Sequence, residues 1–174
     1  MAVTIRAASS FDPSVHGEIE QAADELFRAY FGVLPWDENA AAPGEHGYRE
    51  RLLEAHDGPT VLGFARMLEV GDTLHLEQLS VRPEHARQGI GAALVTAVLA
   101  DAREHGFRSV TLRTFADVPW NAPFYERCGF RTVAEPPSAF HAGLVRTEAR
   151  LGLLVHGERV HMIAMTAEGS EAIS

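Results

Sequence analysis

Two glycines, Gly89 and Gly91, stand where a strand gives way to a helix, an arrangement that can bind phosphate. Residues 76–81 have the composition of a buried strand, and residues 88–105 have the apolar spacing of an amphipathic helix. A Gly-x-Gly loop that leads directly into a helix points several backbone N–H groups, and the positive end of the helix dipole, at one place. The stretch therefore predicts an anion site for a phosphate-bearing ligand.

Two common phosphate-binding loops do not match this stretch. A Walker loop needs a lysine and a serine or threonine after its last glycine, whereas Gly91 is followed by Ala92 and Ala93. The dinucleotide-binding fingerprint needs a third glycine, and Leu94 occupies that position. The fingerprint also belongs near the start of a parallel sheet, whereas this loop follows a predicted antiparallel hairpin. The sequence excludes the first loop and disfavours the second.

A third pattern fits. Arg87-Gln88-Gly89-Ile90-Gly91-Ala92 resembles the pyrophosphate-binding loop of the Gcn5-related N-acetyltransferase (GNAT) superfamily, Gln/Arg-x-x-Gly-x-Gly/Ala, which lies between the fourth strand and the third helix. The segment from Asn121 through Tyr125 to Gly129-Phe130 resembles the second cofactor segment of the family. The order of predicted elements over residues 3–165 is also that of the family, so the resemblance covers nearly the whole chain. One position departs from the pattern, because Ala86 stands where the family has Gln or Arg and Arg87 follows it.

The resemblance implies transfer of an acetyl group from acetyl-CoA to an amine by direct attack. It implies that two parallel strands, 76–81 and 109–114, splay at their C-terminal ends and that the pantetheine arm pairs in the gap like an extra strand. The pyrophosphate would lie on the backbone amides of residues 88–92. The expected cofactor-binding residues are Leu79, Ser80, Val81, Arg87, Gln88, Gly89, Ile90, Gly91, Ala92, Asn121 and Tyr125.

Two side chains are the candidate catalytic groups. Tyr125 matches the general acid of the family, because a phenol with a pKa of about 10 keeps its proton at neutral pH and can protonate the leaving thiolate. Glu77 is the candidate base, directly or through water, because members of the family often carry a Glu in this strand region; its neighbours could also partly desolvate the carboxylate and raise its pKa. His75 and Asp117 are reserve bases.

Each of these residues also has a purely structural interpretation. Glu77 can be a strand residue on the solvent face, and Tyr125 can be a core residue of an apolar helix face. Asn121 can be the N-cap of the short helix that follows it, either instead of binding the cofactor or in addition. Cys128 is assigned to packing, because no activating neighbour is evident.

Apolar periodicity along the chain predicts one α/β (α+β) domain over residues 1–166 and a loose tail over 167–174. We expect a mixed sheet of six to seven strands with helices on both faces. Its N-terminal strands form an antiparallel meander that ends in a hairpin of residues 60–70 and 73–81. Strand 109–114 follows the glycine loop and its helix, so a right-handed crossover makes it parallel to strand 76–81. The remaining predicted elements are strands 3–7, 130–133 and 159–165, helices 19–31 and 121–128, a helical pattern over 139–154, and a strand or helix end over 48–55.

The bulk composition limits the partners and the compartment. Net charge is −9, which disfavours nucleic acid, and all 15 basic side chains are arginine, which excludes a lysine nucleophile. No apolar run approaches the roughly 18 residues that span a membrane, and the N-terminus lacks the core of a signal peptide. One cysteine fits a reducing interior, so we expect a cytoplasmic protein. The nine histidines lack zinc-ligand spacing, so no metal is expected.

The function predicted by these observations is N-acetylation of a primary amine, either a small molecule or a protein N-terminus. A non-catalytic acyl-CoA sensor or partner-binding module on the same fold is the competing class. Ala86 favours the sensor, whereas Asn121 and Tyr125 favour the enzyme. A homodimer is left open.

Acidic residues give a weak indication of the acceptor. Asp37, Glu38, Glu69 and Asp72 stand in predicted turns that could border a substrate pocket. They would suit a cationic amine such as a polyamine, an aminoglycoside or a protein N-terminus, although ordinary solvated acids predict the same composition. The turn-rich segment 32–44 is either a surface connector or a wall of that pocket.

Overall fold

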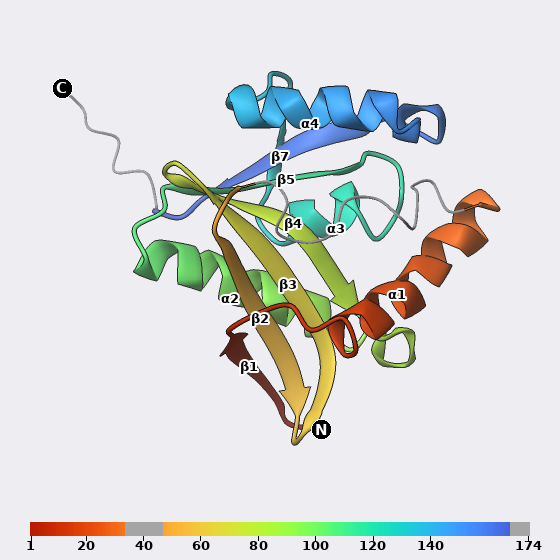
Figure 1. The fold of residues 1–174 in the computed structure, drawn as a ribbon, viewed down its shortest axis with the longest axis vertical. Helices are drawn as coiled ribbons and strands as arrows, with labels where there is room; N and C mark the ends of the chain where they lie inside the picture. Colours follow the sequence, from red (N-terminus) through yellow and green to blue (C-terminus); the bar gives the residue numbers. More distant parts are fainter. Residues whose placement is uncertain (34–46, 168–174) are drawn as a thin grey trace.

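The computed structural model of the protein describes residues 1–33 and 47–167. They form one seven-stranded mixed sheet in the order β1-β2-β3-β4-β5-β7-β6, with helices on both faces (Figure 1). The strands are β1 (Val3–Ala8), β2 (Glu50–Asp57), β3 (Thr60–Val70), β4 (Thr73–Val81), β5 (Ser109–Phe115), β6 (Arg131–Val133) and β7 (Arg159–Met165). The helices are α1 (His16–Phe31), α2 (Ile90–Glu104), α3 (Ala122–Arg127) and α4 (Ala139–Arg150), with short 3-10 turns η1 (Pro83–His85) and η2 (Leu153–Val155). This arrangement confirms the predicted fold class.

The first four strands form the predicted antiparallel meander. Gly71, with a positive φ of 60°, makes the turn between β3 and β4, and both strands have the predicted bounds. The ambiguous segment 48–55 becomes strand β2, not a helix end. The helical pattern over 139–154 is interrupted, because Gly152 adopts a φ of 77° and separates α4 from η2. Asp37, Glu38 and most of the segment 32–44 lie outside the described residues, as does the tail from 168 onward.

Strands β4 and β5 are parallel only at their first residues. Thr73 lies opposite Ser109, and the pairing ends where His75 lies opposite Thr111. Beyond this point β4 stays paired with β3 through Val81, while β5 stays paired with β7 through Phe115. The two strands therefore diverge toward their C-terminal ends, which confirms the predicted splayed pair.

A β-bulge lies at the start of the divergence. Arg66 of β3 is opposite Gln78, but Met67 is opposite Leu76, so Glu77 is the extra residue of β4. A bulge bends its strand and increases the local twist. This bulge turns the second half of β4 away from β5.

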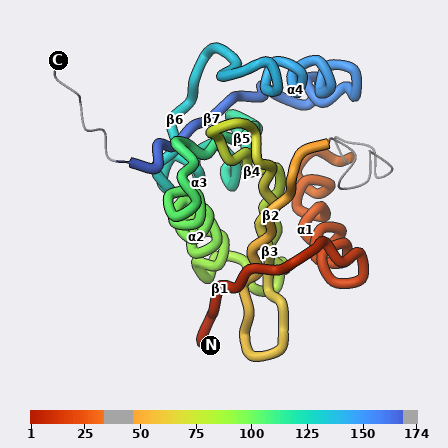
Figure 2. Tube along the Cα trace, turned by 60° about the vertical axis from the view of Figure 1, so that its left-hand side comes forward, coloured from red at the N-terminus to blue at the C-terminus, as the bar shows by residue number. Residues whose placement is uncertain are grey.

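The two faces of the sheet carry different helices. Helices α2 and α3 pack on one face through a large apolar core that includes Leu94, Val98 and Phe130 (Figure 2). Helix α1 lies on the opposite face, where Ile19, Leu52 and Phe64 form a smaller cluster. Helix α4 contacts the sheet through a polar group of β5. Thr111 points away from the α2 core, and its Oγ1 lies 2.8 Å from His141 Nε2 of α4. Helix α4 therefore covers the same face as α1.

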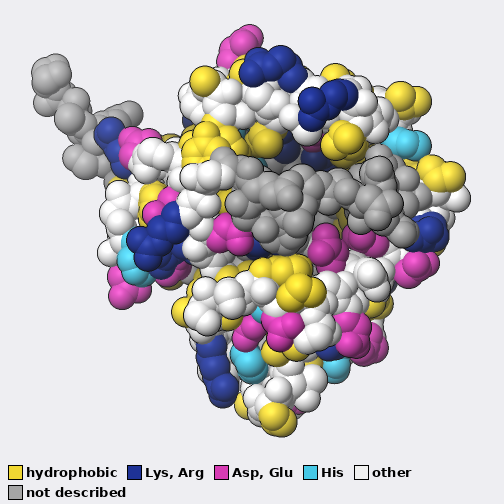
Figure 3. All heavy atoms as spheres, viewed as in Figure 1, with side chains coloured by type: hydrophobic (Ala, Val, Ile, Leu, Met, Phe, Trp, Pro, Cys, Tyr) yellow, Lys and Arg dark blue, Asp and Glu magenta, His cyan; other side chains and the backbone are white. Residues whose placement is uncertain are grey.

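The surface charge, the length of the helices and the placement of possible metal ligands complete the description of the fold. Acidic side chains lie at several places on the face shown in Figure 3, mixed with fewer arginines. Within residues 1–33 and 47–167 no helix is long and apolar enough to cross a membrane. The same residues contain no group of three or more His, Cys, Asp or Glu that could hold a metal ion.

Candidate active site

The glycine loop leaves the N-terminus of α2 open. The helix starts at Ile90, two residues later than predicted, because its N-cap Gly89 adopts a left-handed φ of 80°. No side chain caps the helix, and Ala93 N–H donates to Gly89 O at 2.9 Å as the first helical bond of this turn. The N–H groups of residues 90–92 precede that bond, so they have no acceptor inside the helix and are available to an anion.

Backbone conformation around the loop is unusual in a second place. Arg87 has a φ of 61°, and among the described residues it is the only non-glycine with a positive φ. A left-handed conformation costs an L-residue roughly 1–2 kcal/mol, and such strain tends to occur at functional sites. A Cβ added at Gly91 would lie 3.4 Å from the Phe124 ring of α3, which is van der Waals contact. The loop and α3 therefore approach each other closely.

The ladder between β3 and β4 shows which backbone groups face the gap. Arg82 N–H donates to Leu62 O at 2.8 Å, so these residues form a hydrogen-bonded pair. Hydrogen-bonded and non-hydrogen-bonded pairs alternate along an antiparallel ladder. The alternation turns the backbone groups of Leu79 and Val81 away from β3, toward the gap. The backbone of Ser80 instead faces β3, and its buried hydroxyl accepts a hydrogen bond from Gln78 Nε2 at 3.3 Å.

Tyr125 lies on α3 beside the loop. Its side chain is half-buried, and its ring makes edge contacts with Phe124 and Phe130 at centroid distances of 5.0 and 5.8 Å. Burial raises the pKa of the Tyr125 hydroxyl above its ordinary value. The phenol therefore keeps its proton at neutral pH, as a general acid must. The packing of the Tyr125 ring in the core is therefore compatible with a role of its hydroxyl as a general acid.

Asn121 connects α3 to β5. Its side-chain Oδ1 accepts hydrogen bonds from Thr114 Oγ1 at 2.5 Å and from Phe115 N–H at 3.3 Å. Asn121 is the N-cap residue of α3, but its side chain makes no cap hydrogen bond, and its carbonyl accepts from Tyr125 N–H at 3.0 Å. The Asn121 side chain instead fixes the position of Tyr125 relative to the end of β5.

Glu77 stands on the bulge at the edge of the gap. Its side chain is 29% exposed, and Oε2 lies 3.8 Å from Nε of Arg66. Arg66 is only 8% exposed, and its guanidinium lies over the Phe11 ring at 4.8 Å. Glu77 is therefore neither a fully solvated strand residue nor a desolvated one, because a buried arginine on the α1 face accompanies it.

His75 is unsuited to the role of reserve base. It is buried at the last paired position of β4, and its Nδ1 lies 3.0 Å from Thr111 Oγ1. Burial, reinforced by His141, lowers its pKa to about 3. An imidazole with so low a pKa is a weak base, and its hydrogen bond serves the packing between strands. Asp117, the other reserve base, is exposed on the loop after β5.

Two acids proposed to border the substrate pocket do not do so. Asp72 precedes β4 at the end opposite to the glycine loop, and its Oδ2 lies 3.8 Å from Arg108 Nη1. Glu69 lies near the same end, and its Oε1 is 3.3 Å from Arg51 Nη1. The hairpin geometry places both acids far along the sheet from the gap, where arginines accompany them.

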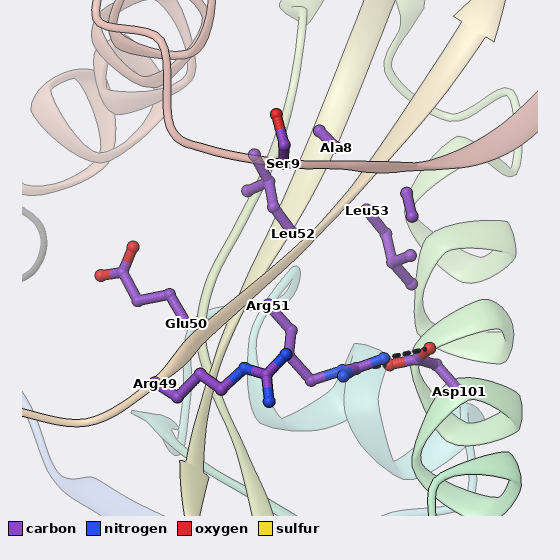
Figure 4. Close-up of a pocket in the computed structure, with 9 residues that line it drawn as sticks. Ala8, Ser9, Arg49, Glu50, Arg51, Leu52, Leu53 and Asp101 are labelled. Atoms are coloured by element: carbon purple, nitrogen blue, oxygen red, sulfur yellow. Dashed lines mark hydrogen bonds and ion pairs between the residues drawn. The ribbon is translucent and has the colours of Figure 1, made fainter.

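A surface hollow beside β1 and β2 also lies away from the loop. It has a volume of about 220 Å³ and is lined mainly by β1 and β2, together with Asp101 near the C-terminal end of α2. Figure 4 shows Arg51 pointing across it to Asp101, with Nε 2.8 Å from Oδ2. The Arg51 guanidinium is already satisfied by Asp101 and Glu69, so this hollow offers an anion little.

Sequence reasoning missed Arg66 and the aromatic residues at the end of α1. A single charge inside the apolar run of β3 could have indicated Arg66, because a central strand rarely tolerates an unaccompanied charge. The aromatic residues Tyr30 and Phe31 were assigned only to a helix. Their proximity to Phe115 of β5 depends on tertiary packing.

Comparison with known proteins agrees with this geometry. The acetyltransferase (GNAT) family model matches residues 17–130, which include β4, the glycine loop and α3, and the chain belongs to this family. A Bacillus subtilis (strain 168) protein named as an acetyltransferase is 31% identical over 90 residues, or 52% of this chain. That match spans 58% of the length of the curated relative.

Solved structures share the fold at low sequence identity. The ribosomal-protein-S18-alanine N-acetyltransferase from Escherichia coli has a TM-score of 0.65 at 18% identity, covering 99% of both chains. The PaiA N-acetyltransferase from Thermoplasma acidophilum, solved in complex with coenzyme A, has a TM-score of 0.60 at 14% identity, covering 95% of this chain and 99% of that one. These likenesses establish the fold.

Proposed function

We propose that this protein moves an acetyl group from acetyl-CoA to a primary amine by direct attack within the gap between β4 and β5. The observation that carries the proposal is the end of β4–β5 pairing at His75 and Thr111, followed by the open N-terminus of α2. An extended chain can pair with an unsatisfied strand edge, and a polyanion can lie on uncapped helix amides. Pantetheine is such an extended chain, and the pyrophosphate is such a polyanion.

The residues present fit this cosubstrate. The gap-facing backbone groups of Leu79 and Val81 would bind the pantetheine amides, as the ladder alternation allows. The amides of residues 88–92 would hold the pyrophosphate, and the exposed Arg87 would add positive charge beside it. The aligned amides bind a polyanion without any contribution from the Ala86 side chain.

The transfer requires a definite exchange of bonds and protons. Acetyl-CoA supplies an activated thioester carbonyl. The ammonium of the acceptor first loses a proton to the Glu77 carboxylate, directly or through water. The amine nitrogen then forms a bond to the carbonyl carbon while a backbone N–H near Leu79 polarises the oxygen. The carbon–sulfur bond breaks with its electron pair on sulfur, and the Tyr125 hydroxyl protonates the thiolate. The amide nitrogen gives its second proton, through water, to the Tyr125 phenolate, and Glu77 returns its proton to solvent.

Release of free CoA thiol tests the proposal. The purified protein is incubated with acetyl-CoA and a panel of primary amines, and the thiol is measured with DTNB. Replacing Tyr125 with Phe should lower kcat by about 10²-fold, which is the usual contribution of a general acid. The Kd for CoA, measured by calorimetry, should change little. Tyr48→Phe, on a tyrosine packed against Phe140, is the matched control.

Two results would contradict the proposal in different ways. Equal turnover by the Tyr125→Phe variant would remove the acid role from this residue. Tight CoA binding with no thiol released by any amine would favour a non-catalytic acyl-CoA sensor on the same fold. Ala86 is the sequence feature that favours the sensor.

A further inference from the structure

A second hollow, of about 100 Å³, lies at the C-terminal end of β5. The end of α1, the loop that follows β5 and the loop that leads into β7 enclose it. Its lining consists of Tyr30, Phe31, Phe115, Asp117, Val118, His156, Gly157 and Glu158. Phe115 lies on the same face of β5 as Thr111 and Arg113, because side chains two residues apart on a strand share a face. Its ring therefore points to the α1 face. The hollow therefore borders the diverging end of the strands on the face opposite to α2 and the glycine loop.

Aromatic rings form the walls of this hollow. The Phe31 ring centroid lies 5.1 Å from that of Phe115, 5.7 Å from that of His156 and 5.0 Å from that of Tyr30. Trp120 supports Tyr30 from behind at 5.2 Å. Aromatic faces carry negative potential and attract a cation that lies over them. Several rings around a small space favour a single cationic group.

The charges around the hollow have the complementary sign. Asp117 and Glu158 are exposed carboxylates that line it. Arg159 lies over the Phe115 ring at 4.6 Å and shares the Glu148 carboxylate with Arg113, so one positive charge of this cluster is left against the two lining carboxylates. The net effect is a negatively charged, ring-lined space, which a protonated amine fits.

The volume limits what can enter. Pockets for drug-sized ligands are roughly 300–1,000 Å³, so a hollow of about 100 Å³ suits the ammonium end of a ligand rather than its whole body. The rest of such a ligand must lie over the rim. Tyr30, which lines the hollow, is 49% exposed, and Val155, which precedes the lining residue His156 in sequence, is 85% exposed. An apolar rim favours an apolar ligand body.

We infer that this hollow is the acceptor site and that the acceptor is a primary amine on an aryl or alkyl body. This inference rests on the proposed acetyl transfer and narrows its substrate class. A polyamine would place further cations on the apolar rim, and an aminoglycoside would place hydroxyl groups there. Both would lose the solvation of those groups without gaining partners.

Competition among three acceptors tests the substrate class. Turnover with acetyl-CoA is measured for 2-phenylethylamine, spermidine and kanamycin. We expect kcat/KM for 2-phenylethylamine to exceed the other two by about tenfold or more, which corresponds to about 1.4 kcal/mol. A higher kcat/KM for spermidine or kanamycin would overturn the inference and leave the proposed acetyl transfer intact.

Variants of the two carboxylates test the place. The double variant Asp117→Asn with Glu158→Gln should raise KM for 2-phenylethylamine about tenfold, while the Kd for CoA stays constant. Asp72→Asn removes an exposed carboxylate at the opposite end of the sheet and should leave KM unchanged. An unchanged KM in the double variant would overturn the inference.

Direct binding separates the two proposals if no amine is turned over. Calorimetric titration of the CoA-bound protein with 2-phenylethylamine should then still show binding that the double variant weakens. Absence of binding to the wild-type complex would overturn the acceptor site, whereas binding without turnover would overturn only the proposed transfer.

Discussion

The α4 side of β5 and the open end of the β4–β5 pair treat their polar groups in opposite ways. Under α4, Thr111 Oγ1 lies within hydrogen-bond distance of both His75 and His141, and the buried carboxylate of Glu148 contacts Arg113 and Arg159. At the open end, the amides at the N-terminus of α2 are uncapped, and the backbone groups of Leu79 and Val81 face away from β3. The first set of groups is largely paired within the protein, whereas the second is available to a ligand.

This difference distinguishes structural polarity from functional polarity. Buried histidines and charges attract attention in a structure, and perturbed pKa values often occur at active sites. Here the strongest histidine perturbations belong to the α4 side of the sheet, where side chains hold α4 in place. The open end is marked by backbone geometry, namely a lost ladder, a bulge and an uncapped helix. Unsatisfied backbone groups locate the candidate active site better than buried charge does.

The largest expected effect on stability comes from disrupting the ion pairs of Glu148 under α4. Glu148→Gln leaves the guanidinium groups of Arg113 and Arg159 together without their shared carboxylate. Removing one partner of a buried ion pair typically costs about 3–5 kcal/mol. Denaturant unfolding should show this loss, whereas Glu104→Gln on the exposed end of α2 should be nearly neutral. Comparable stability of the two variants would mean that α4 is held by other contacts.

The next effect comes from the open end. Gly89→Ala adds a side chain at a left-handed φ of 80° beside the amides that would hold the pyrophosphate. Gly71→Ala introduces similar strain, at a φ of 60°, in the remote β3–β4 turn. Both variants should lose roughly 1 kcal/mol of stability. Only Gly89→Ala should also weaken CoA binding, by about tenfold in calorimetric Kd. Equal CoA affinity in the two variants would move the pyrophosphate away from this loop.

The smallest effect concerns His161. Both ring nitrogens of this buried histidine lack a hydrogen-bond partner within residues 1–33 and 47–167, and burial together with Arg113 lowers its pKa to about 4. His161→Leu removes two unsatisfied polar atoms and should stabilise the protein at pH 7 by about 1 kcal/mol. Thermal and denaturant unfolding measure this change, and destabilisation at pH 7 would contradict it.

The same variant should alter the pH dependence of stability. His75 and His161 have folded pKa values below the unfolded value of about 6.5, so the unfolded chain binds more protons in this range. Stability should be fully present above about pH 6.5 and fall toward pH 4, by up to about 1.4 kcal/mol per pH unit for each histidine. His161→Leu should flatten this slope. An unchanged slope would assign the acid sensitivity to other groups.

Much of the fold could be predicted because it depends on local patterns. Alternation and the turn at Gly71 define the bounds of β3 and β4, and the crossover rule makes β5 parallel to β4. The start of α2 was predictable for the same reason, because the glycine loop directly precedes it in the sequence. Such features need no knowledge of which distant residues meet.

The details of the candidate site could not be predicted, because they depend on register and packing. Nothing in the sequence around Glu77 shows that it is a bulge residue with Arg66 beside it. Asn121 has the residue type of an N-cap, yet Thr114 and Phe115 take its side chain. The meeting of Tyr30 and Phe31 with Phe115 joins segments more than eighty residues apart in the sequence.

A crystal structure of the protein with CoA would show directly whether the cosubstrate binds between β4 and β5. We expect pantetheine to lie in this gap and to hydrogen-bond the backbone of Leu79 and Val81. We also expect the pyrophosphate on the amides of residues 88–92 and the sulfur within reach of the Tyr125 hydroxyl. CoA bound outside this gap, for example in the hollow beside Arg51 and Asp101, would contradict the account.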